Sequence, residues 1–162
     1  MDDGAQLTTL LHTLDRLPGP DHLEFPDGFD HARAKARAIR LRDRLTHDFG
    51  HPCDVDDQIQ DASHHYEIAV PAEATGAGVL LVVRLSSFGD LAAVTVPGPF
   101  GQESPEGAVT PEPLSVVDIA LRDLRYTPVP ARLLHRPYDG VSDWLARESG
   151  RATWWTRFFD YL

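Results

Sequence analysis

Several kinds of residue are scarce in this chain of 162 residues, and each scarcity excludes a class of protein. The single cysteine, Cys53, excludes a disulfide bond within the chain. The longest uninterrupted apolar run, residues 79–83, is far shorter than the roughly 20 residues that a membrane-spanning helix needs. No positively charged segment followed by an apolar one opens the chain, as it would in a secretory signal. We therefore expect a cytoplasmic protein with no membrane partner.

Basic residues are also scarce relative to acidic ones. The chain has 15 Lys and Arg against 25 Asp and Glu, a formal net charge of −10. Because a nucleic-acid-binding surface needs basic side chains, this balance argues against nucleic acid as the main partner. The hydrophobic fraction of 42% is that of a globular protein and not of a disordered one. At this length we expect one domain spanning residues 1–162.

Two helices are expected in the first fifty residues. Leucines spaced three and four positions apart predict a helix over residues 7–17, and a Pro-Gly-Pro sequence ends it, so residues 1–29 form an N-terminal helix and linker. Asp30 can cap a second helix that runs to about residue 49, where Gly50 ends it. One face of this helix carries a narrow apolar stripe: Ala34, Ala38, Leu41, Leu45 and Phe49.

Between residues 53 and 97 the hydrophobic period changes from 3.6 to 2, which predicts strands. Residues 64–70 alternate between apolar and polar, as in a half-buried strand. Residues 79–85 are nearly all apolar and suit a central strand, residues 91–96 suit a third, and residues 53–60 a weaker fourth. Because the connections are too short for parallel crossovers, we expect an antiparallel meander.

The remainder of the chain predicts more helices and one edge strand. Residues 98–113 hold seven Gly or Pro and predict a long loop. Ser115 and Asp118 are spaced as a capping box for the next helix. Two prolines limit residues 127–135 to an edge strand at best, and a short helix is expected near residues 142–149. The expected fold is α+β: an antiparallel β-meander of three to four strands, a possible edge strand, and N-terminal and C-terminal helices packed on one face.

Aromatic residues are concentrated at the C-terminus, where six of the fourteen lie in the last nineteen positions. Helical spacing there predicts a polar face made of Thr153, Thr156, Arg157 and Asp160. The other positions are filled by Trp154, Trp155, Phe158, Phe159, Tyr161 and Leu162. We expect this helix to be enclosed in the core. The alternative is an exposed aromatic surface that binds a partner or forms a homodimer.

Potential metal ligands are densest in residues 47–65. His47 and His51 are four positions apart, which on one helix could bring two imidazoles to a metal ion, with Cys53 or an aspartate completing the shell. Against this, Gly50 is expected to end the helix before His51. We therefore assign no metal ligand and no cofactor, and keep a metal-binding domain or metal-dependent enzyme as the alternative function.

Motifs for covalent catalysis or phosphate binding are absent. The sequence has no Gly-x-Ser-x-Gly and no Gly-x-x-x-x-Gly-Lys. No catalytic residue is assigned, and the sequence favours a protein that is not an enzyme without settling the question.

Acidic residues form a block at the start of the predicted sheet, without a basic residue inside it. The block consists of Asp54, Asp56, Asp57, Asp61, Glu67 and Glu73, within a segment, residues 50–113, whose net charge is −9. Such a block could attract a basic partner through long-range electrostatics. It could instead be a solvated edge that prevents sheet-to-sheet aggregation. We take the six residues as candidate partner-binding residues.

The second predicted helix carries the opposite charge. Arg33, Arg37, Arg40 and Arg44 form a stripe beside its apolar face, and residues 30–49 have a net charge of +3. An anionic partner could bind there. We favour the simpler interpretation that these side chains flank the buried stripe and pair with acidic neighbours.

These observations favour a non-enzymatic protein-binding module with a basic protein partner. Small acidic α+β domains of this build are similar, at the level of fold alone, to bacterial toxin-neutralising immunity proteins and to secretion-chaperone-like adaptors. The similarity implies salt-sensitive association with a basic protein as the function to test.

Overall fold

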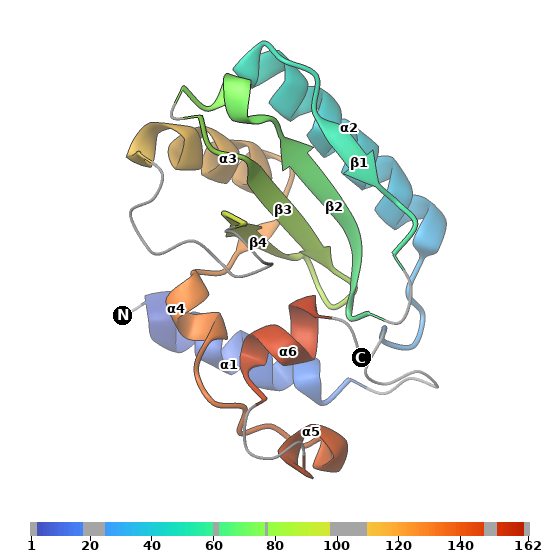
Figure 1. The fold of residues 1–162 in the computed structure, drawn as a ribbon. Coiled ribbons are helices and arrows are strands. Elements are labelled where there is room, and N and C mark those ends of the chain that lie inside the picture. Colours follow the sequence, from blue (N-terminus) through green and yellow to red (C-terminus); the bar gives the residue numbers. More distant parts are fainter. Residues whose placement is uncertain are drawn as a thin grey trace.

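The structure is a computed structural model that describes residues 3–17, 25–59, 62–76, 78–97, 110–147 and 152–160. Within these residues no helix is long and apolar enough to cross a membrane. The elements follow one another as α1 (Asp3–Asp15), α2 (His31–Phe49), β1 (Asp54–Asp56), β2 (His64–Val70), the 3₁₀ turn η1 (Ala72–Ala74), β3 (Leu81–Ser86), β4 (Leu91–Thr95), α3 (Pro111–Asp123), β5 (Thr127–Pro128), α4 (Ala131–Leu134), α5 (Asp143–Arg147) and α6 (Trp154–Phe159) (Figure 1).

The predicted α+β fold is confirmed, with a sheet of five strands in the order β1-β2-β3-β4-β5. Strands β1 to β4 pair antiparallel, as the short connections require. Strand β5 pairs parallel to β4 through two residues only. A parallel pair needs a long crossover connection, and α3 lies in the connection between these two strands.

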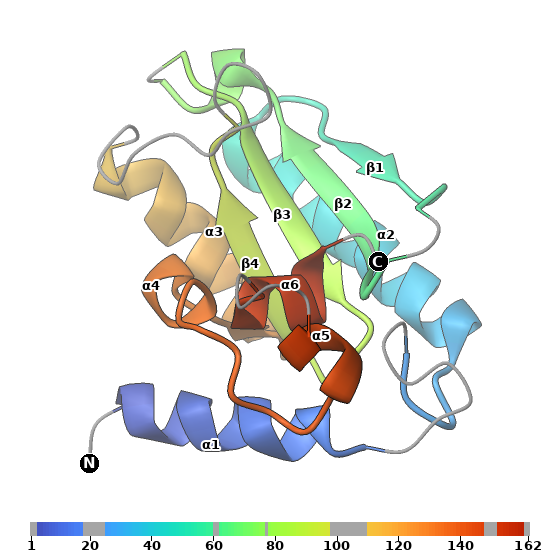
Figure 2. The ribbon, with the colours of Figure 1, turned by 60° about the horizontal axis from the view of Figure 1, so that its bottom comes forward.

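Helices cover both faces of the sheet, so the expectation that they pack on one face is wrong (Figure 2). Helices α2 and α3 pack against Ile68, Val83 and Ala92, whereas α1, α4 and α6 pack with Leu91 and Ala93 on the other side. Consecutive apolar residues in β4 point to opposite faces, so each face needs its own cover. The sheet therefore separates two apolar cores.

Helix α2 begins and ends where the sequence predicts. The Asp30 side chain accepts a hydrogen bond from the Arg33 backbone N–H, which satisfies one of the unpaired donors of the first turn. Gly50 ends the helix in the left-handed conformation, with φ of 70°. Of the predicted stripe, Ala38, Leu41 and Leu45 are fully buried, and Ala34 and Phe49 pack at its margin.

Two predicted boundaries in the second half of the chain are wrong. Helix α3 begins at Pro111, four residues before the expected start at Ser115, because proline is tolerated in a first turn whose N–H groups have no helical partner. The predicted loop therefore ends at residue 110, and residues 98–109 lie outside the described residues. Of the expected edge strand over residues 127–135, only Thr127–Pro128 pairs, and the chain then turns into α4.

The C-terminal aromatic residues are mostly enclosed, as expected. Trp154, Phe158 and Phe159 are buried in the core beside α1 and α4, so they are not available to a second copy of the chain. Trp155 is half-buried, and Trp144 on α5 is 49% exposed. Tyr161 and Leu162 lie outside the described residues.

The predicted polar face of this helix is wrong at Arg157, which is 0% exposed. Its Nε donates to Asp15 Oδ1 on α1 at 2.6 Å, and its guanidinium lies 4.3 Å from the centre of the Phe88 ring. Asp15, itself 1% exposed, also accepts hydrogen bonds from the Tyr138 hydroxyl and the Val141 backbone N–H. A buried charge is tolerable only when it is paired and hydrogen-bonded, and here both conditions are met. This network joins the two ends of the chain.

Candidate functional site

Two of the predicted acidic residues lie side by side on the edge strand β1. Asp54 and Asp56 are exposed, whereas Val55 between them packs against the core beneath the strand. In the register of the sheet, Asp54 lies opposite Ala69 of β2 and Asp56 lies opposite Glu67. Because side chains of paired residues point to the same face, these four residues share one side of the sheet.

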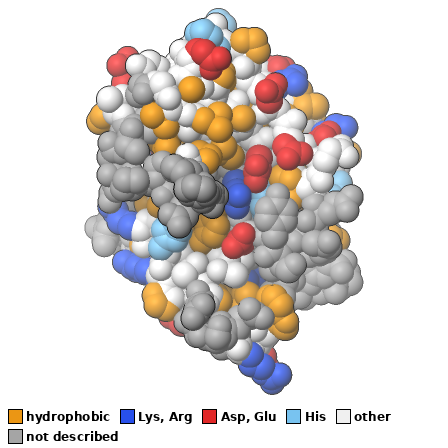
Figure 3. Space-filling view, in the orientation of Figure 1, with side chains coloured by type: hydrophobic (Ala, Val, Ile, Leu, Met, Phe, Trp, Pro, Cys, Tyr) orange, Lys and Arg blue, Asp and Glu red, His pale blue; other side chains and the backbone are white. Residues whose placement is uncertain are grey.

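Asp54 and Ala69 begin one row of paired residues across the sheet, and Asp56 and Glu67 begin a second. Strand β3 extends both rows, since Ala69 pairs with Val82 and Glu67 pairs with Arg84. Every member of the two rows is exposed or half-buried. We name this surface the open sheet face, defined by Asp54, Asp56, Glu67, Ala69, Val82 and Arg84. In the view of Figure 1, helices α4 and α6 lie below the upper part of β2 and β3 and do not cross it. Figure 3 shows acidic side chains beside a hydrophobic area on this side of the molecule.

Within the open sheet face, Glu67 is paired with two neighbouring side chains of the same chain. Its Oε1 lies 3.1 Å from His64 Nε2 and 3.0 Å from Arg84 Nε. The His64 ring, followed by the Arg84 guanidinium, holds the pKa of the Glu67 carboxyl below its usual range. Arg84 is itself fixed, because it donates to the Phe159 carbonyl at 2.6 Å and lies over the Trp155 ring. Glu67 therefore gives the surface a rigid, internally paired charge.

Asp54 and Asp56 differ from Glu67, because no ion pair with another described residue reaches either side chain. Asp56 Oδ1 accepts a hydrogen bond from the Gln58 backbone N–H at 3.0 Å, which fixes the carboxylate without neutralising its charge. Two exposed carboxylates on one strand, neither of them in an ion pair with a described residue, form a local negative potential on the face that also carries Ala69 and Val82.

Of the other three predicted acidic residues, the two that the structure describes, Asp57 and Glu73, are not part of the open sheet face. Asp57 Oδ2 lies 3.8 Å from Nζ of Lys35 on α2. Its pKa is held below the usual range by the Gln58 side-chain hydrogen bond and, to a lesser extent, by Lys35. Glu73 is exposed on η1, beyond the end of β2. Asp61 lies outside the described residues. The sequence pattern could show that Asp54 and Asp56 alternate with Val55, but not that Lys35 reaches Asp57.

For the alternative function, a metal site, the described residues provide no set of ligands. No three of their His, Cys, Asp or Glu side chains are placed to hold a metal ion. His47 and His51 are exposed on either side of Gly50, which ends α2 as predicted. Cys53 is buried, and burial raises the pKa of its thiol. The described part of the chain therefore offers neither a metal centre nor a reactive thiolate.

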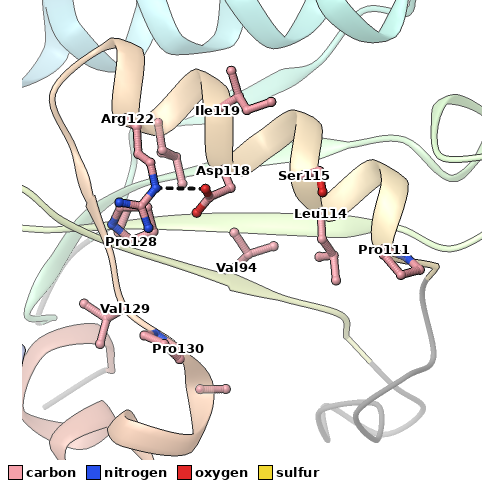
Figure 4. A pocket seen from close by; sticks show the side chains of 13 residues that line it. Val94, Pro111, Leu114, Ser115, Asp118, Ile119, Arg122, Pro128, Val129 and Pro130 are labelled. Atoms are coloured by element: carbon pink, nitrogen blue, oxygen red, sulfur yellow. Dashed lines mark hydrogen bonds and ion pairs between the residues drawn. The ribbon is translucent and has the colours of Figure 1, made fainter. Parts of the chain in front are cut away.

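A separate apolar cleft of about 530 Å³ lies between α3, β4 and the segment that leads to α4 (Figure 4). Asp118 and Arg122 are the only charged groups among its described lining residues, and they pair with each other at 2.8 Å. Leu114 and Ile119 from α3 are 38% and 55% exposed at this cleft. Its described walls offer mainly apolar contact, and their one carboxylate, Asp118, is held in the ion pair with Arg122.

Comparison of the sequence with protein-family models and with curated proteins, and of the fold with solved structures, finds no match.

Proposed function

We propose that this chain is a non-enzymatic protein-binding module that takes a basic partner on the open sheet face. The observation that supports the proposal most directly is the juxtaposition of Asp54 and Asp56, which have no ion pair with a described residue, with half-buried Ala69 and Val82. Protein interfaces combine apolar contact with charge that complements the partner.

The residues of this surface have different tasks in the proposed complex. Lys or Arg side chains of the partner pair with Asp54 and Asp56 at the sheet edge. Apolar side chains of the partner lie against Ala69 and Val82. The Glu67–Arg84 pair keeps its present hydrogen bonds, so this part of the surface binds without reordering. The binding energy comes from the apolar contact, and the carboxylates supply orientation and a fast, salt-sensitive association.

In its most specific form, the proposal is a role like that of immunity proteins, in which the acidic surface covers a basic toxin. An adaptor that carries a basic protein is the other form. Both require the same surface, and both are supported by the net charge of −10 over the chain as a whole.

Capture experiments with matched variants test the proposal. The wild-type chain, the Asp54→Asn/Asp56→Asn variant and a control variant, Asp27→Asn/Glu112→Gln, serve as immobilised bait in lysate of the source organism. The control removes the same charge from two other exposed positions. At about 20 mM salt, where screening is weak, we expect the wild type and the control to retain the same basic protein and the open-face variant to lose it.

Three outcomes would contradict the proposal. The first is retention of the basic protein by the Asp54→Asn/Asp56→Asn variant, and the second is equal loss by both variants, which would indicate net charge alone. The third is that the open-face variant captures every protein that the wild type captures, but aggregates. That result would mean that the carboxylates only protect an exposed sheet edge.

A further inference from the structure

A second charged surface lies on the other side of the sheet, where the arginine stripe of α2 meets the turn after α3. A pocket of about 390 Å³ opens there. We name it the arginine pocket, because four of its eight lining residues are arginines: Arg33, Arg37 and Arg40 from α2, and Arg125 from the turn. The remaining lining residues are Ala36, Asp90, Asp123 and Leu124.

One of the four arginines is structural. Arg37 Nη1 donates to Asp90 at 2.6 Å, and its Nη2 donates to the Leu124 carbonyl at 3.2 Å. The guanidinium lies over the Tyr126 ring, 4.4 Å from its centre. These contacts fix α2 against the turn and neutralise Asp90. For Arg37, the expectation that the stripe pairs with acidic neighbours is therefore met.

The second acid of the pocket, Asp123, also has an ion-pair partner, which lies outside the pocket. Asp123 pairs with Arg44 at 3.0 Å, and Arg44 additionally binds Asp48. Both carboxylates that line the pocket thus have an arginine partner, and neither forms an ion pair with the three other arginines of the pocket. Four arginines and two aspartates line the pocket, so its lining is net positive in a chain whose formal net charge is −10.

The other three arginines of the pocket are Arg33, Arg40 and Arg125. All three side chains are exposed, and no ion pair with another described residue reaches any of them. Arg33 and Arg40 are seven positions apart on α2 and so lie on the same helix face, two turns apart. Three guanidinium groups therefore border one pocket without an ion-pair partner among the described residues.

The backbone at Arg125 gives an independent indication of a functional requirement. It has φ of 69°, and it is the only described residue other than glycine with positive φ. It occupies the position after the helix end where the Tyr126 N–H bonds back to the Leu121 carbonyl, a position normally held by glycine. A side chain there costs about 1 kcal/mol relative to glycine. Strain of this kind is retained where the side chain has a task, and this side chain borders the pocket.

We propose that the arginine pocket binds a small phosphorylated anion with at least two phosphate groups, such as the diphosphate group of an organic ester. Guanidinium forks match phosphate oxygens geometrically, and three forks suit a diphosphate better than a single carboxylate. The pocket volume lies at the lower end of the range for small-ligand sites, about 300–1,000 Å³. No aromatic residue is among the described lining residues, and Tyr126 is buried beneath Arg37, so no ring is placed to stack on a base, which disfavours a nucleic-acid strand. This site lies on the opposite side of the sheet from the open sheet face, so neither proposal depends on the other.

Titration calorimetry with pyrophosphate at about 20 mM salt tests this assignment. Inorganic phosphate and citrate serve as comparison ligands, because citrate carries similar charge on carboxylates. The test variant is Arg40→Gln/Arg125→Gln, which leaves Arg37 and its contacts in place. The control variant is Arg132→Gln/Arg136→Gln, which removes the same charge from two exposed positions around α4.

We expect the wild type to bind pyrophosphate more tightly than phosphate or citrate. The Kd should rise about tenfold in the test variant, the effect of losing two exposed charge pairs, and stay within about twofold in the control. Absence of pyrophosphate binding, an equal weakening in both variants, or citrate binding as tight as that of pyrophosphate would each overturn the assignment. Thermal unfolding of every variant confirms that the comparison is between folded proteins.

Discussion

Acidification provides a sharp test of the packing at the start of β2. His65 is half-buried between the rings of Phe29 and Tyr66, with ring centres at 5.3 and 4.6 Å, and among the described residues no hydrogen-bond partner reaches its buried Nδ1. Burial lowers the pKa of His65 from its ordinary value of 6.5 to about 3, and the nearby His64 and His31 charges add to the effect. The folded protein therefore keeps this ring neutral, whereas the unfolded chain protonates it.

The sign and size of the effect follow from this difference. Because the pKa is lower in the folded state, the stabilisation is complete above the ordinary pKa of 6.5 and is lost as the pH falls from there toward about 3. Between pH 7 and pH 5 the loss is about 2 kcal/mol, an upper value because the ring keeps some contact with water. Glu67 contributes little in this window, since its lowered pKa costs stability only below its ordinary value of 4.5.

Urea unfolding at the two pH values measures the loss directly. The His65→Phe variant keeps an aromatic ring but cannot titrate, so we expect its free energy of unfolding to fall by less than about 0.5 kcal/mol over the same interval. The exposed His47→Gln variant is the control and should behave as the wild type. A wild-type stability that does not change between pH 7 and pH 5, or an equal loss in His65→Phe, would refute the reasoning.

Three further substitutions have defined outcomes. Arg157→Met should lower the free energy of unfolding in urea by about 3–5 kcal/mol, because it leaves the buried Asp15 carboxylate without its cation; a loss below about 1 kcal/mol would contradict that pairing. Gly140→Ala should be strongly destabilising in the same assay, since an added Cβ would overlap Asp15 Oδ2 and the Tyr138 hydroxyl, and wild-type stability would show that the network can shift. Arg125→Gly should raise stability by about 1 kcal/mol while weakening pyrophosphate binding, and a loss of stability would mean that the Arg125 side chain has a structural role.

The parts of the fold that could be predicted are those set by local sequence. Helix α2 is bounded by a side-chain cap at Asp30 and a left-handed Gly50, both of which act within a few residues. The alternation over β2 reappears as strictly alternating burial in the structure. The buried Arg157 could not be predicted, because its partner Asp15 is 142 positions away and helical spacing alone made it a surface residue.

For the two candidate surfaces too, the features set by local sequence could be predicted and those set by long-range contacts could not. Alternation placed Asp54 and Asp56 together, but only the register of three strands brings Val82 and Arg84 beside them. The arginine stripe on α2 was visible in the sequence, whereas the choice between paired and unpaired arginines depends on Asp90 in the turn before β4, Asp123 on α3 and Arg44 on α2. Long-range pairing is what local patterns cannot supply.

The central claim is that Asp54 and Asp56 of the open sheet face bind a basic partner, and the salt dependence of that binding tests it most directly. The Kd for the captured protein is measured by calorimetry at about 50 mM and about 200 mM salt, with the wild type, Asp54→Asn/Asp56→Asn and the Asp27→Asn/Glu112→Gln control. We expect the wild type and the control to weaken together as salt rises, and the open-face variant to bind weakly with a much smaller dependence on salt. An open-face variant with the affinity and salt dependence of the wild type would contradict the claim.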